Sequence, residues 1–417
     1  MCTNFRYLLL IAALFCFSTI TNSSFAQESE TAEKQEESNA AKAVAAEEEE
    51  EELPRGYAFE IVNSVKATDV KSQDSTGTCW CFATASFMES ELIRMNKGQH
   101  NISEMFIVRN IYKEKARNYV HRSGKANFSE GALAHDFMNA VRRYGMMPEE
   151  AYNGLDEGAD RHDHGEMSAV LKGFLDSLVA QRTLSKKWEP AFSSVLDVYL
   201  GAAPESFEYR GAEFTPQEFS NSLGFDTRDY INVTSFIHHP FGESFVLEIP
   251  DNFSNGSFYN VPIDDLVATI DNAIENGYSV AWDGDVSERG FDRNSGIAIM
   301  PANGRPNFRE PSEEIEVTQE SRQATFEEHS TTDDHLMHLT GIAKDKLGNK
   351  YYLIKNSWGE VGKHEGYLYM SEAYVRAKTM AILVHKDALV DVEVSRPAEE
   401  ATADESSSLN GNSSNND

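Results

Sequence analysis

Apolar residues recur at three- and four-residue intervals along much of the 417-residue chain, a spacing typical of helices that bury one face. The pattern predicts helices over residues 79–95, 100–110, 133–144, 165–200 (in two blocks) and 263–274. Gly145 follows the third of these helices and suits a C-cap. Residues 301–333 are polar, and we expect them to form a long surface excursion.

Short extended segments dominate between residues 334 and 370. Strands are predicted over residues 278–282, 336–343, 351–355 and 366–370. A turn at Gly348-Asn349 makes the second and third of these strands a hairpin. An antiparallel hairpin brings its open ends together, so His335 should lie near Asn356.

The helix that begins at Cys79 carries two cysteines that face different ways. Cys81 shares a stripe with apolar residues and is expected to be a small core residue. Cys79 lies at the first turn, where unsatisfied N–H groups and the positive end of the helix dipole favour a thiolate. On this segment alone, Cys79 can be a nucleophile or another core residue, because free cysteines are usually buried.

The first 26 residues have the pattern of a secretory signal, with Arg6, an apolar run and a small-x-small cleavage site that ends at Ala26. We therefore expect an exported protein, periplasmic or secreted. The apolar run is too short for stable membrane insertion, and no later stretch is predicted to span a membrane. Signal removal would leave Cys79 and Cys81, which lie too close in sequence to form an unstrained disulfide.

Negative charge is concentrated near the two ends of a chain whose net charge is −31. Residues 27–53 hold eleven glutamates against two lysines, and residues 391–417 hold seven acidic residues against one arginine. This composition predicts a disordered acidic linker over residues 27–54 and a disordered tail over residues 391–417, on either side of a folded domain over residues 55–390. The domain is itself acidic, which argues against nucleic-acid binding.

Cysteine peptidase chemistry needs a thiolate, an imidazole that ionises it and later protonates the leaving amine, and a group that fixes the imidazole tautomer. Cys79, His335 and Asn356 suit these roles. Gln73 can supply a side-chain N–H to the oxyanion of the tetrahedral intermediate, beside the backbone N–H of Cys79. Trp358 is placed to keep water off the histidine–asparagine hydrogen bond. No metal or cofactor is expected.

The motifs Q-x5-C-W, D-H-x-M and K-N-S-W-G occur in this order, which resembles the papain-like cysteine peptidases. The long interval between the cysteine and histidine motifs, and blocks such as EGALAHDFMNAVRRYG and VPIDDLVATIDNAIENG, resemble the bleomycin hydrolase and aminopeptidase C branch. The resemblance implies an α+β papain-like fold, in which a helical domain that carries the nucleophile helix packs against an antiparallel β-barrel-like domain. A helical insertion is expected over about residues 155–260.

The resemblance also implies individual roles. It makes Cys79 the nucleophile and His335 the general base and acid. It makes Asn356 the orienting group and Gln73 the oxyanion donor, with Trp80 and Trp358 in support. Gly131-Ala132 falls where the family pairs a Gly-Gly strip with the substrate backbone. Ala132 replaces the second glycine and implies a tighter subsite.

The activity that the resemblance implies is removal of N-terminal residues from peptides through a thiol-acyl intermediate. Peptides are the expected partners, and the family suggests a hexameric homo-oligomer. In that family the chain's C-terminal carboxylate anchors the substrate amine, whereas this chain continues through the tail at 391–417, so an endopeptidase of the same fold stays open. A peptide-binding or scaffold protein that has lost turnover is the other alternative, motivated by Ala132 and the acidic tails.

Overall fold

The structure is a computed structural model that describes residues 55–155 and 158–390. The predicted signal peptide, acidic linker and C-terminal tail lie outside the described residues. The residues that are described belong to one unit that begins at Arg55. None of the described helices is both long and apolar enough to cross a membrane.

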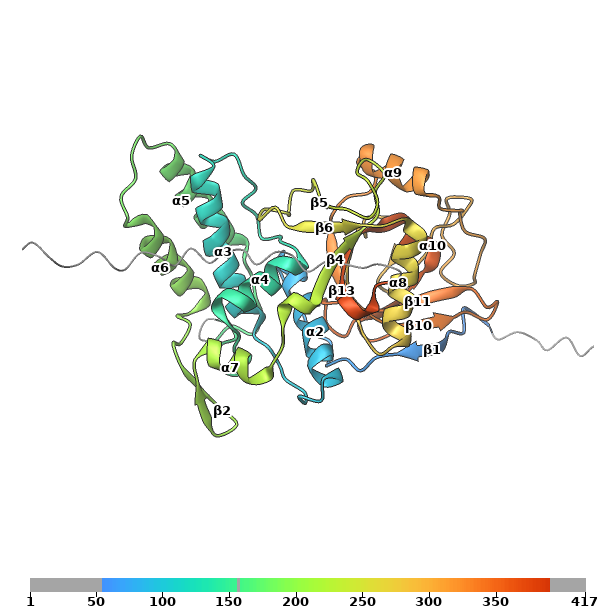
Figure 1. The fold of residues 1–417 in the computed structure, drawn as a ribbon, viewed down its shortest axis with the longest axis horizontal. Coiled ribbons are helices and arrows are strands. Elements are labelled where there is room, and N and C mark those ends of the chain that lie inside the picture. Colours follow the sequence, from blue (N-terminus) through green and yellow to red (C-terminus); the bar gives the residue numbers. More distant parts are fainter. Residues whose placement is uncertain (1–54, 156–157, 391–417) are drawn as a thin grey trace, which may run out of the picture. The chain divides into compact units, whose positions relative to one another are not determined.

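Helices dominate the first half of the described chain (Figure 1). They are α2 (Cys79–Arg94), α3 (Glu104–His121), α4 (Ala134–Tyr144), α5 (Gly165–Val179), α6 (Trp188–Leu200) and α7 (Pro216–Leu223). The Ser103 hydroxyl caps α3 by accepting the Phe106 N–H, and Gly145 ends α4 with a φ of 78°, as the sequence predicted. Helices α5, α6 and α7 fall within the predicted insertion.

The second half of the chain supplies most of a large mixed sheet. Its strands are β1 (Glu60–Ser64), β4 (Tyr230–Thr234), β5 (Ser244–Val246), β6 (Ser257–Asn260), β7 (Val280–Gly284), β8 (Phe291–Asp292), β9 (Ile297–Ala298), β10 (His335–Lys344), β11 (Lys350–Lys355), β12 (Tyr367–Ser371) and β13 (Thr379–His385). The order along the sheet is β5-β6-β4-β13-β7-β10-β11-β12-β9-β8, and β1 also pairs with β10. A separate hairpin joins β2 (Phe207–Tyr209) to β3 (Ala212–Phe214).

The predicted hairpin around residue 348 is confirmed by the antiparallel pairing of β10 with β11, in which His338 lies opposite Lys355. On its other side β10 pairs with β7, and this register places His335 opposite Gly284. Strand β10 is therefore central, and its first residue lies at the end of the hairpin that also carries Asn356.

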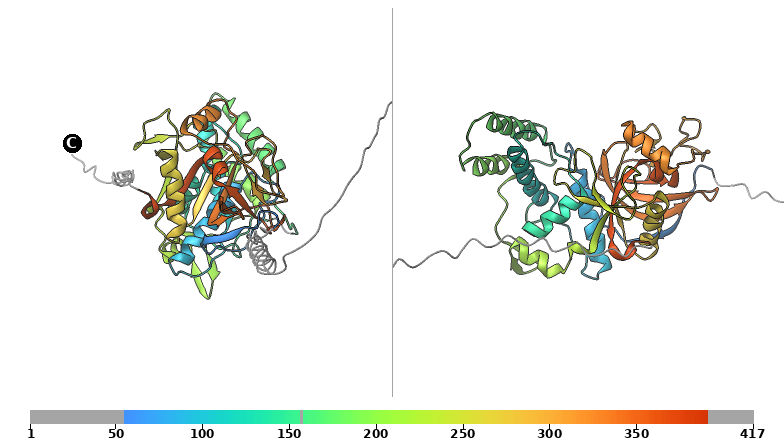
Figure 2. Two further views of the ribbon diagram at one scale, coloured as in Figure 1. Left: turned by 90° about the vertical axis from the view of Figure 1, so that its right-hand side faces the viewer. Right: turned by 45° about the horizontal axis from the view of Figure 1, so that its top comes forward.

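Helix α2 lies between the helices of the first half of the chain and the sheet (Figure 2), where it contacts α3 and α4 on one side and β7 and β10 on the other. Every residue from Cys79 to Leu92 is buried. The expectation of a single buried stripe on α2 is therefore wrong. Two apolar surfaces cover the helix, so its polar positions are buried as well.

The remaining helices accompany the sheet: α8 (Ile263–Glu275), α9 (Gln319–Glu327), α10 (Glu372–Lys378) and the short 3₁₀ turns Thr227–Asp229 and Lys386–Ala388. Apolar residues of α8 and α10 pack with those of the central strands in one core cluster. Residues 301–333 lie largely at the surface, as expected, although they include the helix α9, which was not predicted. Its Arg322 is buried and donates to the backbone carbonyls of Ser235 and Arg376.

Candidate active site

Cys79 is the first residue of α2, and its side chain is 9% exposed. Burial raises the pKa of the Cys79 thiol to about 12, and the carboxyls of Asp333 and Asp283 act in the same direction. The backbone N–H groups of Leu336 and Trp80 lie against the sulfur and act in the opposite direction. The expectation that the helix N-terminus favours a thiolate is therefore wrong for the unliganded protein, because desolvation outweighs the helix end.

His335 and Asn356 are brought together as the hairpin predicted, with 2.8 Å between His335 Nε2 and Asn356 Oδ1. Asn356 Oδ1 also accepts the Ser357 N–H at 2.7 Å, which identifies that atom as the amide oxygen. The Nε2 atom of the ring must therefore carry a proton. Nδ1 is left unprotonated in the neutral ring, which is the form that can accept a proton from a thiol.

Trp358 covers this pair. Its ring stacks on the His335 imidazole with 4.8 Å between centroids and 28° between planes. His335 is 4% exposed, and burial lowers its pKa to about 4, although the hydrogen bond to Asn356 acts in the opposite direction. Burial therefore favours the neutral form of the imidazole.

Gln73 joins the site through Ser357. The Ser357 hydroxyl donates to Gln73 Oε1 at 2.7 Å, and the Gln73 backbone N–H donates to the Ser357 carbonyl at 2.8 Å. With Oε1 fixed as an acceptor, Gln73 Nε2 supplies two N–H groups. One donates to the Thr76 carbonyl at 2.7 Å, which leaves the second for another acceptor.

A buried polar network joins α2 to the end of β11 just before Asn356. The Lys355 ammonium donates to Ser86 of α2 at 2.8 Å and to Thr68 at 3.1 Å. Ser86 in turn lies 2.8 Å from His338 Nδ1, which makes His338 part of this support. The strand end that carries Asn356 is therefore tied directly to the helix that carries Cys79.

The Gly131-Ala132 segment is tied to the start of α2 by Trp80, whose indole N–H donates to the Glu130 carbonyl at 3.0 Å. The Gly131 carbonyl accepts a hydrogen bond from the Lys115 ammonium. Ala132 is buried and packs in the helical core.

Asp251 explains why residue 131 has no side chain. A Cβ at position 131 would overlap the Asp251 carboxylate. Asp251 Oδ1 accepts from Asn127 at 2.9 Å and from Ser129 at 3.3 Å, so the carboxylate is held against the glycine.

The sequence reasoning missed two carboxyl groups near Cys79, those of Asp283 and Asp333, and a third, that of Asp251, which acts on both of them. Asp333 stands two residues before His335. This closeness in sequence to the predicted general base was the one feature that could have indicated an acidic group near the site. Asp334, the neighbour of Asp333, is exposed and accepts from the Thr332 hydroxyl and the Val286 N–H.

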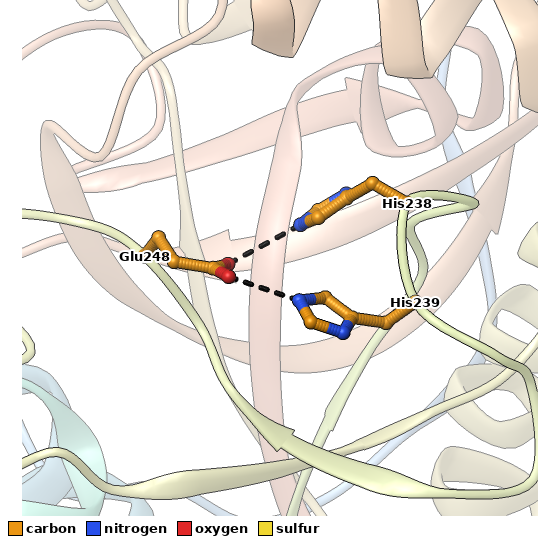
Figure 3. A group of neighbouring side chains, drawn as sticks. All are labelled: His238, His239 and Glu248. Atoms are coloured by element: carbon orange, nitrogen blue, oxygen red, sulfur yellow. Dashed lines mark hydrogen bonds and ion pairs between the residues drawn. The ribbon is translucent and has the colours of Figure 1, made fainter.

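His238, His239 and Glu248 form the group within the described residues whose ligand atoms could hold a metal ion (Figure 3). Glu248 lies 3.2 Å from His238 Nε2 and 2.9 Å from His239 Nε2, through different carboxylate oxygens. Two neutral imidazoles that each donate one N–H satisfy the carboxylate without an ion. This arrangement therefore gives no reason to assign a metal to the group.

A family model, the Peptidase C1-like family, matches residues 120–405 of the chain. The chain belongs to the Peptidase C1-like family. The matched region contains His335 and Asn356, whereas Cys79 and Gln73 precede it.

Curated relatives of this Peptidase C1-like protein extend the similarity. Aminopeptidase G of Lactobacillus delbrueckii subsp. lactis is 23% identical over 365 residues, which cover 76% of this chain and 81% of the relative. Aminopeptidase C of Lactococcus lactis subsp. cremoris is 24% identical over 367 residues, covering 78% and 82%. The mitochondrial Cysteine proteinase 1 of Saccharomyces cerevisiae (strain JAY291) is 20% identical over 380 residues, covering 78% and 76%.

The fold matches a solved structure as well. The crystal structure of PepW from Lactobacillus rhamnosis HN001 superposes with a TM-score of 0.63 at 18% identity, over 88% of this chain and 94% of PepW. These similarities confirm the predicted family of cysteine peptidases and its α+β papain-like fold.

Proposed function

We propose that this Peptidase C1-like protein is an exported aminopeptidase that removes N-terminal residues from peptides through a thioester on Cys79. The observation that carries the proposal is the His335–Asn356 hydrogen bond of 2.8 Å, formed where β10 begins beside the helix end that carries Cys79. Two of its relatives bear the name aminopeptidase, which supports peptides with a free N-terminus as substrates.

In the proposed reaction, His335 Nδ1 takes the proton of the Cys79 thiol as the sulfur attacks the peptide carbonyl carbon. Burial disfavours a lone thiolate and a lone imidazolium, as both pKa shifts indicate. Proton transfer creates the two charges together, and their attraction offsets part of the desolvation cost. Asn356 holds the ring through Nε2, so in this proposal Nδ1 stays directed to the Cys79 sulfur.

The tetrahedral intermediate carries a negative oxygen, for which the free N–H of Gln73 and the backbone N–H of Cys79 are the proposed donors. Collapse of the intermediate breaks the peptide bond, and the His335 imidazolium gives its proton to the leaving amine. Water then attacks the thioester, with His335 again as the base, and releases the N-terminal residue as a free acid.

The test compares Cys79→Ala with wild type on one peptide amide offered with a free and with an acetylated N-terminus. Cys81→Ala is the matched control, because Cys81 is a buried cysteine on the same helix that donates to the Glu104 carbonyl at 3.3 Å. Turnover should disappear in Cys79→Ala and persist in Cys81→Ala, and wild type should prefer the free N-terminus.

Three outcomes would contradict the proposal. Turnover by Cys79→Ala at the wild-type rate would remove the nucleophile assignment. Equal wild-type rates on free and acetylated peptides would favour an endopeptidase. Peptide binding without turnover, together with no labelling of Cys79 by a thiol-directed epoxide, would favour a binding or scaffold protein.

Export is a separate part of the proposal and rests on the residue pattern of positions 1–26. Fractionation of cells that express the full chain, followed by mass spectrometry of the N-terminus, tests it. A mature protein that begins at Gln27 outside the cytoplasm is expected, and an unprocessed cytoplasmic protein would contradict export.

A further inference from the structure

Carboxyl groups gather beside the sulfur of Cys79, on the side of the sheet that faces α2. Asp283 lies on β7 directly opposite Leu336 of β10, and the Leu336 N–H lies against the sulfur. Directly opposite residues of an antiparallel pair point to the same face of a sheet. Asp283 therefore shares its face with Leu336, and its charge reaches Cys79.

Asp283 is 4% exposed, and no N–H or hydroxyl donor from the described part of the chain contacts either of its carboxylate oxygens. The group close enough to share a proton with it is the Asp333 carboxyl, one oxygen of which also lacks a donor. Burying a carboxylate without donors is costly, and buried polar groups in folded proteins are normally paired. Burial and the Asp333 carboxyl accordingly raise the pKa of Asp283.

Asp251 brings a third carboxyl to the same place from the Gly131 side. It is close enough to both Asp283 and Asp333 to raise the pKa of each. Among the described residues, no lysine, arginine or histidine forms an ion pair with any of the three carboxyls. Lys115 is the nearby cation, but its ammonium is hydrogen-bonded to the Gly131 carbonyl and the Ser129 hydroxyl.

We propose that Asp283, Asp333 and Asp251 form a subsite that binds an alkylammonium group of the peptide substrate beside Cys79. The inference rests on the proposed function, because it assigns substrate specificity to that site. An ammonium carries three N–H donors and a positive charge. Among the described residues, both oxygens of Asp283 and one oxygen of Asp333 lack a donor, whereas Asp251 Oδ1 already accepts from Asn127 and Ser129. Charge-assisted hydrogen bonds of this kind are among the strongest in proteins.

The α-ammonium of an N-terminal residue is one source of such a group, and a lysine side chain is the other. The α-nitrogen is separated by one carbon atom from the carbonyl carbon that Cys79 attacks. Its site must therefore lie close to the sulfur, as Asp283 and Asp333 do, and this favours the α-ammonium. On binding, the ammonium takes the place of the proton that the two carboxyls share.

The experiment measures kcat/KM of wild type and Asp283→Asn on four fluorogenic amides: alanyl, N-acetylalanyl, N-acetyl-lysyl-alanyl and N-acetyl-leucyl-alanyl. Asn has the shape of Asp without its charge. The matched control is Asp334→Asn, which removes the same charge from an exposed neighbour of Asp333. Asp251→Asn is a second test variant on the other side of the subsite.

We expect Asp283→Asn and Asp251→Asn to lower kcat/KM for the free alanyl amide about tenfold or more, mainly through KM, with little change for the N-acetylated alanyl amide. Asp334→Asn should keep the wild-type ratio of free to acetylated substrate. The melting temperature of Asp283→Asn should equal or exceed that of wild type, because an unpaired buried carboxyl is removed. This separates loss of binding from loss of folding.

A wild-type preference for the free amide that survives Asp283→Asn and Asp251→Asn would overturn the subsite and leave the aminopeptidase function intact. The opposite result would be a wild type that prefers the lysyl over the leucyl amide and does not distinguish the free N-terminus from the acetylated one. If Asp283→Asn then removed the lysyl preference, the subsite would stand and the aminopeptidase function would be contradicted. Protection of Cys79 from a thiol-directed epoxide by alaninamide, but not by N-acetylalaninamide, measures the same binding without turnover. Equal protection by both compounds would contradict the subsite.

Discussion

Removing the Ser357 hydroxyl should impair turnover without touching a reacting group. The hydroxyl donates to Gln73 Oε1 at 2.7 Å, and both side chains are buried, with exposures of 5% and 6%. In Ser357→Ala the amide oxygen loses its donor, and the hydrogen bond to the Thr76 carbonyl remains to orient the amide. The N–H proposed to stabilise the oxyanion is then held less firmly in its direction.

The magnitude follows from that one contact. A buried acceptor left without its donor costs about 1–3 kcal/mol, which corresponds to a loss of about 5- to 150-fold in kcat if the whole cost falls on the transition state. Complete removal of an oxyanion donor typically costs about 10²–10³ in kcat, so Gln73→Ala sets the upper limit. The double variant should be no slower than Gln73→Ala alone, because Ser357 acts only through Gln73.

The assay is a double-mutant cycle on kcat and KM with a free-amino peptide amide, with Ser90→Ala as the control. Ser90 is a buried serine of α2 whose hydroxyl has no partner among the described residues, so its removal should leave kcat unchanged. The reasoning is refuted if Ser357→Ala keeps the wild-type kcat while Gln73→Ala is slow. It is also refuted if the two losses add in the double variant.

Asn356→Ala should lower kcat by about tenfold or more, because the buried His335 N–H loses its acceptor and the tautomer is no longer fixed. Equal kcat values of the variant and wild type in steady-state assays would contradict this. Burial raises the pKa of Asp333 to about 7. Between about pH 4 and pH 7 the folded protein therefore holds a proton that the unfolded chain has released, and the free energy of unfolding falls as the pH rises. Calorimetry should therefore show that Asp333→Asn melts above wild type at pH 8, with a difference that shrinks toward pH 4; a constant difference would argue against the shift. Gly131→Ala forces a methyl group onto the Asp251 carboxylate and should raise KM for free-amino peptides more than for acetylated ones, which the same amide substrates would reveal.

The sequence predicted one contact of the candidate site better than its surroundings. The order of the cysteine, histidine and asparagine motifs singled out three candidate residues, and the predicted hairpin correctly placed His335 beside Asn356. The net shift of the Cys79 pKa is upward, opposite to the direction expected from the helix end. A helix N-terminus can be recognised in a sequence, whereas burial of that end by a distant strand cannot.

The acidic residues beside the sulfur were missed for a related reason. Asp283 lies one residue beyond the predicted strand over residues 278–282, and its position depends on the register of β7 against β10. One residue of slip would turn it to the opposite face of the sheet. Helix α9 was missed because its segment is polar, although Arg322 supplies the buried contacts.

The Lys355 network has a consequence for building hybrids of this enzyme with its relatives. A cation from the sheet is satisfied by Ser86 and Thr68, which come from the N-terminal part of the chain. A chimaera that joins the helical half of one protein to the strands of another would leave this buried ammonium without its two hydroxyl partners unless all three positions were exchanged as a set. The crossover points that preserve activity are thus set by Ser86 and Thr68, the residues that accept hydrogen bonds from Lys355. The catalytic motifs do not reveal this requirement.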